Sequence, residues 1–132
     1  MFAGFTTRQV RANGITVHVC CGGAGPPVLL LHGYPETHVM WHQVAPVLAR
    51  RFTVVCPDLR GYGDSGKPPG GPEHEGYSKR AMAQDQVAVM AALGFGRFAW
   101  PCQSQLAPQF SFDLAPAFSG AGWEFSFDLA PP

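Results

Sequence analysis

The chain has 132 residues, which is the size of one ordinary domain and is long enough to bury a core. Its nine basic and nine acidic residues cancel, so no electrostatic footprint for nucleic acid or an anionic membrane is present. No apolar stretch approaches the roughly 18 to 20 residues of a membrane span, and the start of the chain lacks a signal-peptide pattern. We therefore expect a soluble, cytoplasmic protein whose partner is a small molecule or another protein.

The first predicted element is an antiparallel hairpin over residues 8–23. Two extended runs flank Asn13-Gly14, a strong signal for a two-residue hairpin turn. In the second run Ile15, Val17 and Val19 alternate with polar residues, which is the pattern of a half-buried strand. We expect this hairpin at the edge of a sheet.

Two largely apolar runs follow and predict buried strands. The first, residues 28–31, ends at His32-Gly33, and the second, residues 52–56, is stopped by Pro57. Short apolar runs of this kind are typical of parallel strands covered by helices on both sides. Residues 97–100 could begin a third such strand.

Helical patterns separate these strands. Residues 39–51 are helix-like, with Pro46 beginning a turn and an apolar stripe at Trp41, Val44, Val47 and Leu48. Strand and helix alternate along the chain, which predicts right-handed crossovers and a mostly parallel, helix-flanked sheet of the α/β class.

A second helix is predicted between Ser78, a suitable N-cap, and Gly94, a suitable glycine after the last turn. Its inward-facing residues should be Met82, Val89, Met90 and Leu93.

The stretch DLRGYGDSGKPP, residues 58–69, has the Gly-x-x-x-x-Gly-Lys spacing of a phosphate-binding loop at Gly61, Gly66 and Lys67. Such a loop needs a helix directly after the lysine, because the helix N-terminus holds the phosphates. Pro68 stands where Ser or Thr should be, and it also disfavours helical backbone at Lys67. We therefore reject a nucleotide site.

The same stretch contains Gly-Asp-Ser-Gly, the nucleophile tetrapeptide of trypsin-like proteases, at residues 63–66. That chemistry requires a His base and a buried Asp on an all-β fold, whereas this chain alternates strand and helix. Ser65 is therefore not expected to be a nucleophile. A sharp structural turn after a strand is the remaining interpretation.

No metal or other cofactor is expected from the side chains that could bind one. His38 and His42 have the i, i+4 spacing of zinc enzymes, but no Glu follows His38 and no third ligand is evident. The cysteines form no Cys-x-x-Cys pair, so buried thiols are favoured over a zinc site or a disulfide framework.

Two turns carry a family resemblance. The sequence His32-Gly33-Tyr34-Pro35 resembles the H-G-x-P turn of the α/β-hydrolase fold, and residues 58–65 resemble the D-x-R-G-x-G-x-S turn after that fold's next strand. The surrounding sequence, with YSKRAMAQD beyond it, is similar to the branch of haloacetate dehalogenases and epoxide hydrolases, and most to the former. The resemblance covers roughly residues 5–99, the first third of a typical member.

The resemblance implies a role for each residue of the first turn. The backbone N–H of Tyr34 would donate to the oxyanion that forms when water attacks a covalent ester, and such donors supply about 2.7 to 4 kcal/mol in comparable enzymes. Pro35 would follow a cis peptide bond, and His32 and Gly33 would shape the turn. Asp58 and Arg60 would hold the second turn and not react. A strand-end turn without catalytic duty is the alternative.

The family's nucleophile is an Asp in a G-x-D-x-G elbow after the next strand, and arginines beside it bind the substrate carboxylate. Here residues 100–105 read WPCQSQ, without Gly, Asp or Arg. Ser104 lacks the flanking glycines that an elbow requires. All five histidines precede this point, whereas the fold's order is nucleophile, acid, His. We expect an incomplete α/β-hydrolase fold without turnover of its own.

Residues 1–99 therefore form the predicted hydrolase part, and residues 100–132 an irregular tail outside the family pattern. The tail repeats Phe-Ser-Phe-Asp-Leu-Ala-Pro at residues 110–116 and 125–131. It is either a docking segment in duplicate or the product of a frameshift or misjoined gene. The functions left open are a haloacetate dehalogenase relative, an epoxide or ester hydrolase relative, and a non-catalytic interaction protein.

One consequence concerns association. If later strands of the family's sheet are lacking, residues 28–31 lie at or near an open edge, and an apolar edge favours pairing with other chains. We expect self-association or marginal folding of the 132-residue chain.

Overall fold

The computed structural model of the protein describes residues 2–100. Ser104 and the duplicated sequence of the tail lie outside the described residues. The predicted boundary between the hydrolase part and the tail falls at the end of the described part. Within the described part of the chain, no helix is long and apolar enough to cross a membrane.

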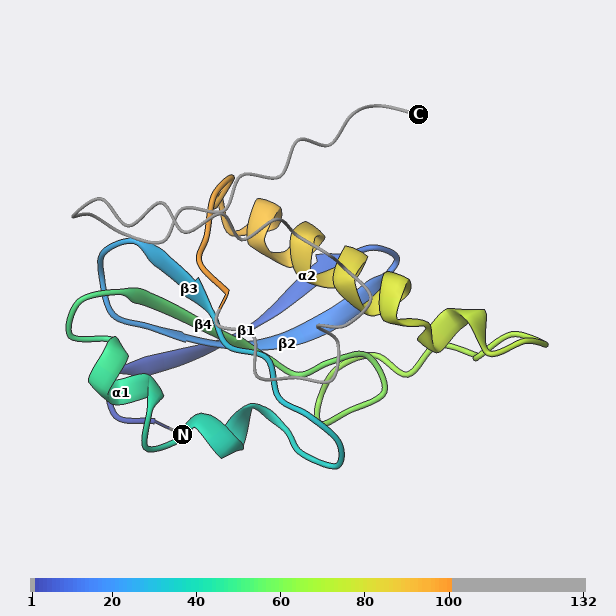
Figure 1. Cartoon of the computed structure of the whole chain (residues 1–132), viewed down its shortest axis with the longest axis horizontal. Coiled ribbons are helices and arrows are strands. Elements are labelled where there is room, and N and C mark those ends of the chain that lie inside the picture. The colour runs from blue at the N-terminus through green and yellow to red at the C-terminus, as the bar shows by residue number, and fades with distance from the viewer. Residues whose placement is uncertain (1, 101–132) are drawn as a thin grey trace, which may run out of the picture.

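A four-stranded mixed sheet forms the centre of the molecule (Figure 1). The strands are β1 (Phe5–Ala12), β2 (Ile15–Gly22), β3 (Pro27–Leu29) and β4 (Thr53–Pro57). Their order across the sheet is β1-β2-β4-β3. The pairs β1–β2 and β2–β4 are antiparallel, whereas β3 and β4 are parallel. The expected α/β-hydrolase-like arrangement, with a hairpin at one side and parallel strands beyond it, is confirmed.

The hairpin turn is where the sequence places it. Asn13 and Gly14 both have positive φ, 48° and 79°, as a type I′ turn requires. The ladder runs from the pair Ala12 and Ile15 to the pair Phe5 and Gly22, so no residue is bulged out. β1 is the edge strand of the sheet, as predicted.

The chain returns beside β3 at its last described residues. The N–H of Leu29 donates to the carbonyl of Ala99 at 2.9 Å, and the N–H of Ala99 donates to that of Pro27 at 2.9 Å. Ala99 thus forms a parallel bridge to Val28. β3 therefore lies between β4 and the start of a further parallel segment, which is the neighbour order that the resemblance implies.

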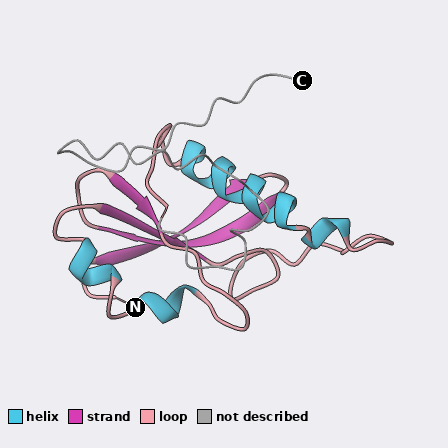
Figure 2. Cartoon of the chain, in the orientation of Figure 1, coloured by secondary structure: helices cyan, strands magenta, loops and turns pink. Residues whose placement is uncertain are grey.

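Helices cover both faces of the sheet (Figure 2). On one face α2 (Lys79–Ala92) packs its fully buried Val89 and Met90 against Val17, Val19 and Val55 of the strands. On the other face lie the 3-10 helix η1 (His38–Trp41) and the short α1 (Ala45–Leu48), over Val54 and Cys56. The central strands are buried from both sides, which explains why residues 28–31 and 54–56 are continuously apolar.

The caps of α2 match the predicted signals. The Ser78 hydroxyl accepts the N–H of Ala81 at 3.2 Å, and Gly94 just beyond the helix has a φ of 88°. Met82 and Leu93 are half-buried at the margin of the interface. A second 3-10 helix, η2 (Glu75–Tyr77), precedes α2.

The helix predicted over residues 39–51 is wrong in its extent and in its buried stripe. The segment is divided into η1 and α1, with Pro46 in the first turn of α1. Trp41 and Ala45 are buried, whereas Val44 and Val47 are 45% and 59% exposed. A 3-10 turn before Pro46 changes the helical phase, so a single 3.6-residue stripe does not describe the segment.

Candidate functional site

The ends of β3 and β4 bring two turns together. Because these strands are adjacent and parallel, the chain leaves both at the same edge of the sheet. Residues 30–35 follow β3 and residues 58–66 follow β4, so the two sequence motifs meet there. In open α/β sheets this edge is where ligands bind.

The first turn presents Tyr34 to solvent. The peptide bond between Tyr34 and Pro35 is cis, as predicted, and the Tyr34 side chain is 85% exposed. The Glu36 N–H donates to the Gly33 carbonyl at 3.0 Å, which closes the turn. The structure thus leaves the outside of this turn accessible to a ligand.

His32 is fully buried and connects the two turns. Its Nε2 accepts the backbone N–H of Leu59 at 2.9 Å, so Nδ1 carries the proton and donates to the Gly33 carbonyl at 2.9 Å. Its ring also makes an edge-on contact with Tyr62, with ring centroids 5.2 Å apart. Both nitrogens are engaged, so His32 shapes the site and is not a free general base.

Asp58 ties the second turn to η1. One carboxylate oxygen, Oδ1, accepts the backbone N–H of His38 at 2.7 Å and bonds its ring Nδ1 at 2.8 Å, and Oδ2 accepts the N–H of Asp64 at 3.2 Å. Burial raises the pKa of this carboxyl, but the hydrogen bonds from His38 and Asp64 lower it more, so the pKa lies below its ordinary value. The carboxylate is ionised at neutral pH and holds the loop.

Arg60 holds the other side of the same turn. It forms a bidentate pair with Asp85 of α2, with Nε and one terminal nitrogen each 2.6 Å from a carboxylate oxygen. Asp85 is fully buried and also accepts from the amide of Asn13 at 2.8 Å, while Arg60 donates to the Gly76 carbonyl. The hydrogen bond from Asp85 raises the pKa of Arg60 despite its burial. The carboxylate of Asp85 on α2 thus connects the hairpin, through Asn13, to the second turn, through Arg60.

The residues that suggested protease or nucleotide chemistry serve the fold. The buried Ser65 hydroxyl donates to the Asp58 carbonyl at 2.6 Å and accepts the His18 N–H at 2.9 Å. Lys67 Nζ bonds the carbonyls of Gly63 at 2.8 Å and Ser65 at 3.2 Å, and no helix begins at Pro68. Both rejections made from the sequence are supported by this geometry.

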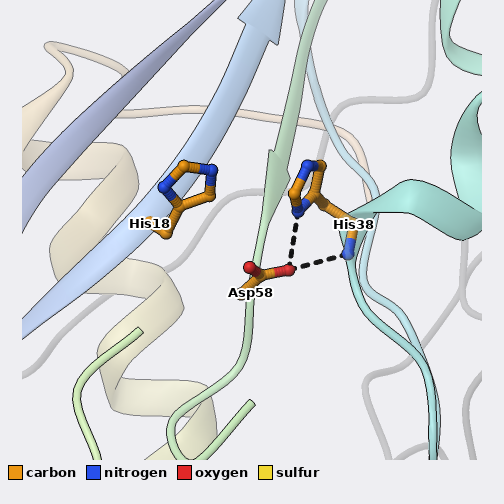
Figure 3. Close-up of side chains that lie close together, drawn as sticks. All are labelled: His18, His38 and Asp58. Carbon is orange, nitrogen blue, oxygen red and sulfur yellow. Dashed lines mark hydrogen bonds and ion pairs between the residues drawn. The ribbon is translucent and has the colours of Figure 1, made fainter. Parts of the chain in front are cut away.

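A cluster that the sequence does not reveal lies beside Asp58 (Figure 3). His18 of β2 stands next to His38, with ring centroids 5.1 Å apart, and one potential ligand atom from each of His18, His38 and Asp58 lies within 4.8 Å of the others. No third ligand is evident beside His38 in the sequence, but the fold brings His18 and Asp58 next to it. His42 is exposed and takes no part in the cluster.

The cysteines described by the structure are free and unreactive. Cys20 and Cys56 are buried and Cys21 is half-buried. Desolvation raises the pKa of all three thiols, that of Cys21 to about 11. They are protonated at neutral pH, which agrees with the interpretation as packing residues.

Comparison with known proteins identifies the fold family of this chain. A family model described as the alpha/beta hydrolase fold matches residues 26–104. A fluoroacetate dehalogenase from Burkholderia sp. is 55% identical over 98 residues, which are 74% of this chain and 32% of the relative. A soluble epoxide hydrolase from Corynebacterium sp. (strain C12) is 34% identical over 140 residues, covering 95% of this chain and 47% of the relative.

A solved structure agrees with these relatives. A Salmonella enterica protein to which an acyltransferase function has been ascribed superposes with a TM-score of 0.74 and 57% identity, over 75% of this chain and 33% of that chain. The chain thus spans between about a third and about half of the length of these three proteins.

Proposed function

Because the chain belongs to the alpha/beta hydrolase fold family, we propose that it carries the first part of a hydrolase site of the haloacetate dehalogenase kind, with Tyr34 as an oxyanion donor. The proposal rests on the turn at residues 32–35, which follows β3 and contains the cis Tyr34-Pro35 bond. A hydrogen bond to His32 links this turn to the turn after β4.

The role of Tyr34 is to bind developing negative charge through its backbone. In the proposed reaction a carboxylate attacks the carbon that bears the halogen, and the halide leaves with the bonding electrons. Water then adds to the carbonyl of the resulting ester as a base takes its proton, and the Tyr34 N–H donates to the oxyanion. Collapse of this intermediate expels the hydroxy acid, which takes up the proton, and frees the carboxylate. A preorganised donor of this kind is worth about 2.7 to 4 kcal/mol. The exposed Tyr34 side chain is not needed for this role.

Three neighbours keep the turn in place. Gly33 accepts hydrogen bonds from Glu36 and from His32, and His32 joins the turn to Leu59. Pro35 completes the cis bond. We propose that these residues position the Tyr34 N–H and do not themselves exchange protons with a substrate.

The substrate class follows from the relatives. The 55% identity to a fluoroacetate dehalogenase favours a small haloacid, and the 34% identity to a soluble epoxide hydrolase makes an epoxide the second candidate. The 132-residue sequence has no G-x-D-x-G elbow after residue 99. We therefore propose that the 132-residue chain itself does not turn over either substrate.

A chimera tests the oxyanion role. Residues 1–99 of this chain replace the equivalent residues of the Burkholderia sp. fluoroacetate dehalogenase, and fluoride release from fluoroacetate is measured. We expect an active chimera. In it, Tyr34→Pro removes the backbone N–H and should lower kcat by about 10²- to 10³-fold.

The matched control is Tyr34→Phe, which keeps the N–H and changes only a solvent-exposed side chain, and its kcat should stay close to that of the unmodified chimera. Circular dichroism and thermal unfolding identify any variant that fails to fold. A folded Tyr34→Pro chimera with undiminished kcat would contradict the role of Tyr34.

A further inference from the structure

Three potential metal ligands converge from three separate elements. His18 lies on β2, His38 begins η1, and Asp58 directly follows β4 (Figure 3). Positions 18, 38 and 58 are 20 residues apart along the chain, yet one ligand atom of each lies within 4.8 Å of the others. No other such group of three is found in the described part of the chain.

We propose that His18, His38 and Asp58 form a binding site for a divalent transition-metal ion of the zinc class. Two imidazole nitrogens and one carboxylate oxygen are ligands that zinc binds in proteins, with water completing a tetrahedral shell. The buried carboxylate of Asp58 supplies negative charge, and the imidazole rings of His18 and His38 supply nitrogen ligands.

The spacing requires a small closure. In a tetrahedral zinc site with bonds of about 2.0 to 2.1 Å, ligand atoms stand roughly 3.4 Å apart, somewhat closer than the 4.8 Å limit that encloses the three atoms here. Asp58 and the backbone of His38 are held firmly by hydrogen bonds. The His18 ring bonds the amide of Gln9 at 3.1 Å in an exposed position, so this ring can rotate toward the other two.

The contact between His38 and Asp58 is compatible with such a site. His38 Nδ1 lies 2.8 Å from Asp58 Oδ1, so a ring nitrogen and a carboxylate oxygen already stand side by side, as two ligands of one ion would. The His38 side chain is 15% exposed and His18 is half-buried, so the cluster lies near the surface. Location, charge and ligand chemistry therefore agree.

The experiment titrates the full 132-residue chain with Zn²⁺ by isothermal calorimetry and with Co²⁺ by absorption spectroscopy. We expect one ion per chain and the visible bands of tetrahedral Co²⁺ with nitrogen and oxygen ligands. His18→Asn and His38→Asn should each weaken binding about tenfold or more, the range seen when metal-site residues are altered. Asn at position 38 can still donate to Asp58, so loss of binding there reports the imidazole ligand.

His42→Asn is the matched control, because it removes an exposed imidazole four residues from His38, and binding should be unchanged. His18→Asn decides the question if His38→Asn does not fold. Three outcomes overturn the proposal: a Kd weaker than about 1 mM, unchanged affinity in His18→Asn, or a thiolate-to-cobalt absorption band that disappears in Cys102→Ser.

Discussion

The Nε2 atom of His32 accepts the backbone N–H of Leu59 at 2.9 Å, which joins the turn after β3 to the turn after β4 through a single buried ring. The other ring nitrogen bonds the carbonyl of Gly33 in the first turn. The two motifs that identify the family are therefore one structural unit, and the position of Tyr34 depends on it.

Replacing His32 tests this unit. His32→Leu leaves the buried Leu59 N–H without an acceptor, and we expect it to lower the free energy of unfolding by about 1 to 3 kcal/mol. His32→Gln places an amide oxygen near the position of Nε2 and should retain part of the stability. Urea unfolding followed by circular dichroism measures both. His42→Leu, at an exposed position, is the control, and an equal loss there would show that the link is unimportant.

The Arg60 and Asp85 pair should be costly to break on one side. Arg60→Met leaves the carboxylate of Asp85 buried and unpaired, and removal of one partner of such a pair typically costs about 3 to 5 kcal/mol. The double variant Arg60→Met with Asp85→Leu should recover much of this loss. Thermal and urea unfolding give the comparison. A single variant no less stable than Arg50→Met, an exposed control, would contradict the role of the pair.

The stability that Asp58 contributes should depend on pH. Its pKa in the folded chain is lowered, so the contribution is fully present above the ordinary value of 3.8 and is lost as pH falls through the folded value. Asp58→Asn should therefore cost about 1.5 to 3 kcal/mol near pH 7, and the difference from the unmodified chain should shrink below pH 4. Urea midpoints between pH 3 and 7 measure it.

Asp64→Asn is the control for that series, because its side chain is exposed and only its backbone N–H bonds Asp58. A difference between Asp58→Asn and the unmodified chain that stays constant or grows as the pH falls would contradict the assigned role of the carboxylate.

Much of the fold follows from local sequence signals. Asn13-Gly14 specifies a tight turn, the apolar runs specify strands buried on both faces, and Ser78 and Gly94 mark the ends of α2. Each of these signals acts within a few residues, and each is confirmed. The segment around Pro46 could not be predicted as well, because the 3-10 turn of η1 shifts the helical phase and brings Ala45, not Val44, to the core.

The site was predictable only in part. The motifs at residues 32–35 and 58–65 place the two turns, and the cis bond before Pro35 is confirmed. The approach of His18 to His38 was not predictable, because it depends on the antiparallel pairing of β2 with β4, in which the Asp58 N–H donates to the His18 carbonyl. Pairing between distant strands leaves no spacing rule in the sequence.

Self-association is expected from the exposed apolar surface. The chain exposes large apolar side chains at Tyr34, Val39, Val44 and Val47, and exposed apolar surface favours contact with another copy. We expect concentration-dependent oligomers in light scattering and their reduction by Val47→Lys. Gln43→Lys adds the same charge at an exposed neighbour and should have little effect. A monodisperse monomer with a cooperative thermal transition would contradict this expectation.

The central proposal is that this chain carries the oxyanion turn of a haloacid hydrolase but not the residues that displace the halide. The direct measurement is halide release from fluoroacetate and chloroacetate by the purified 132-residue chain, compared with a blank without protein. We expect no release above the blank. Release that scales with protein concentration and persists through repeated purification would contradict the proposal.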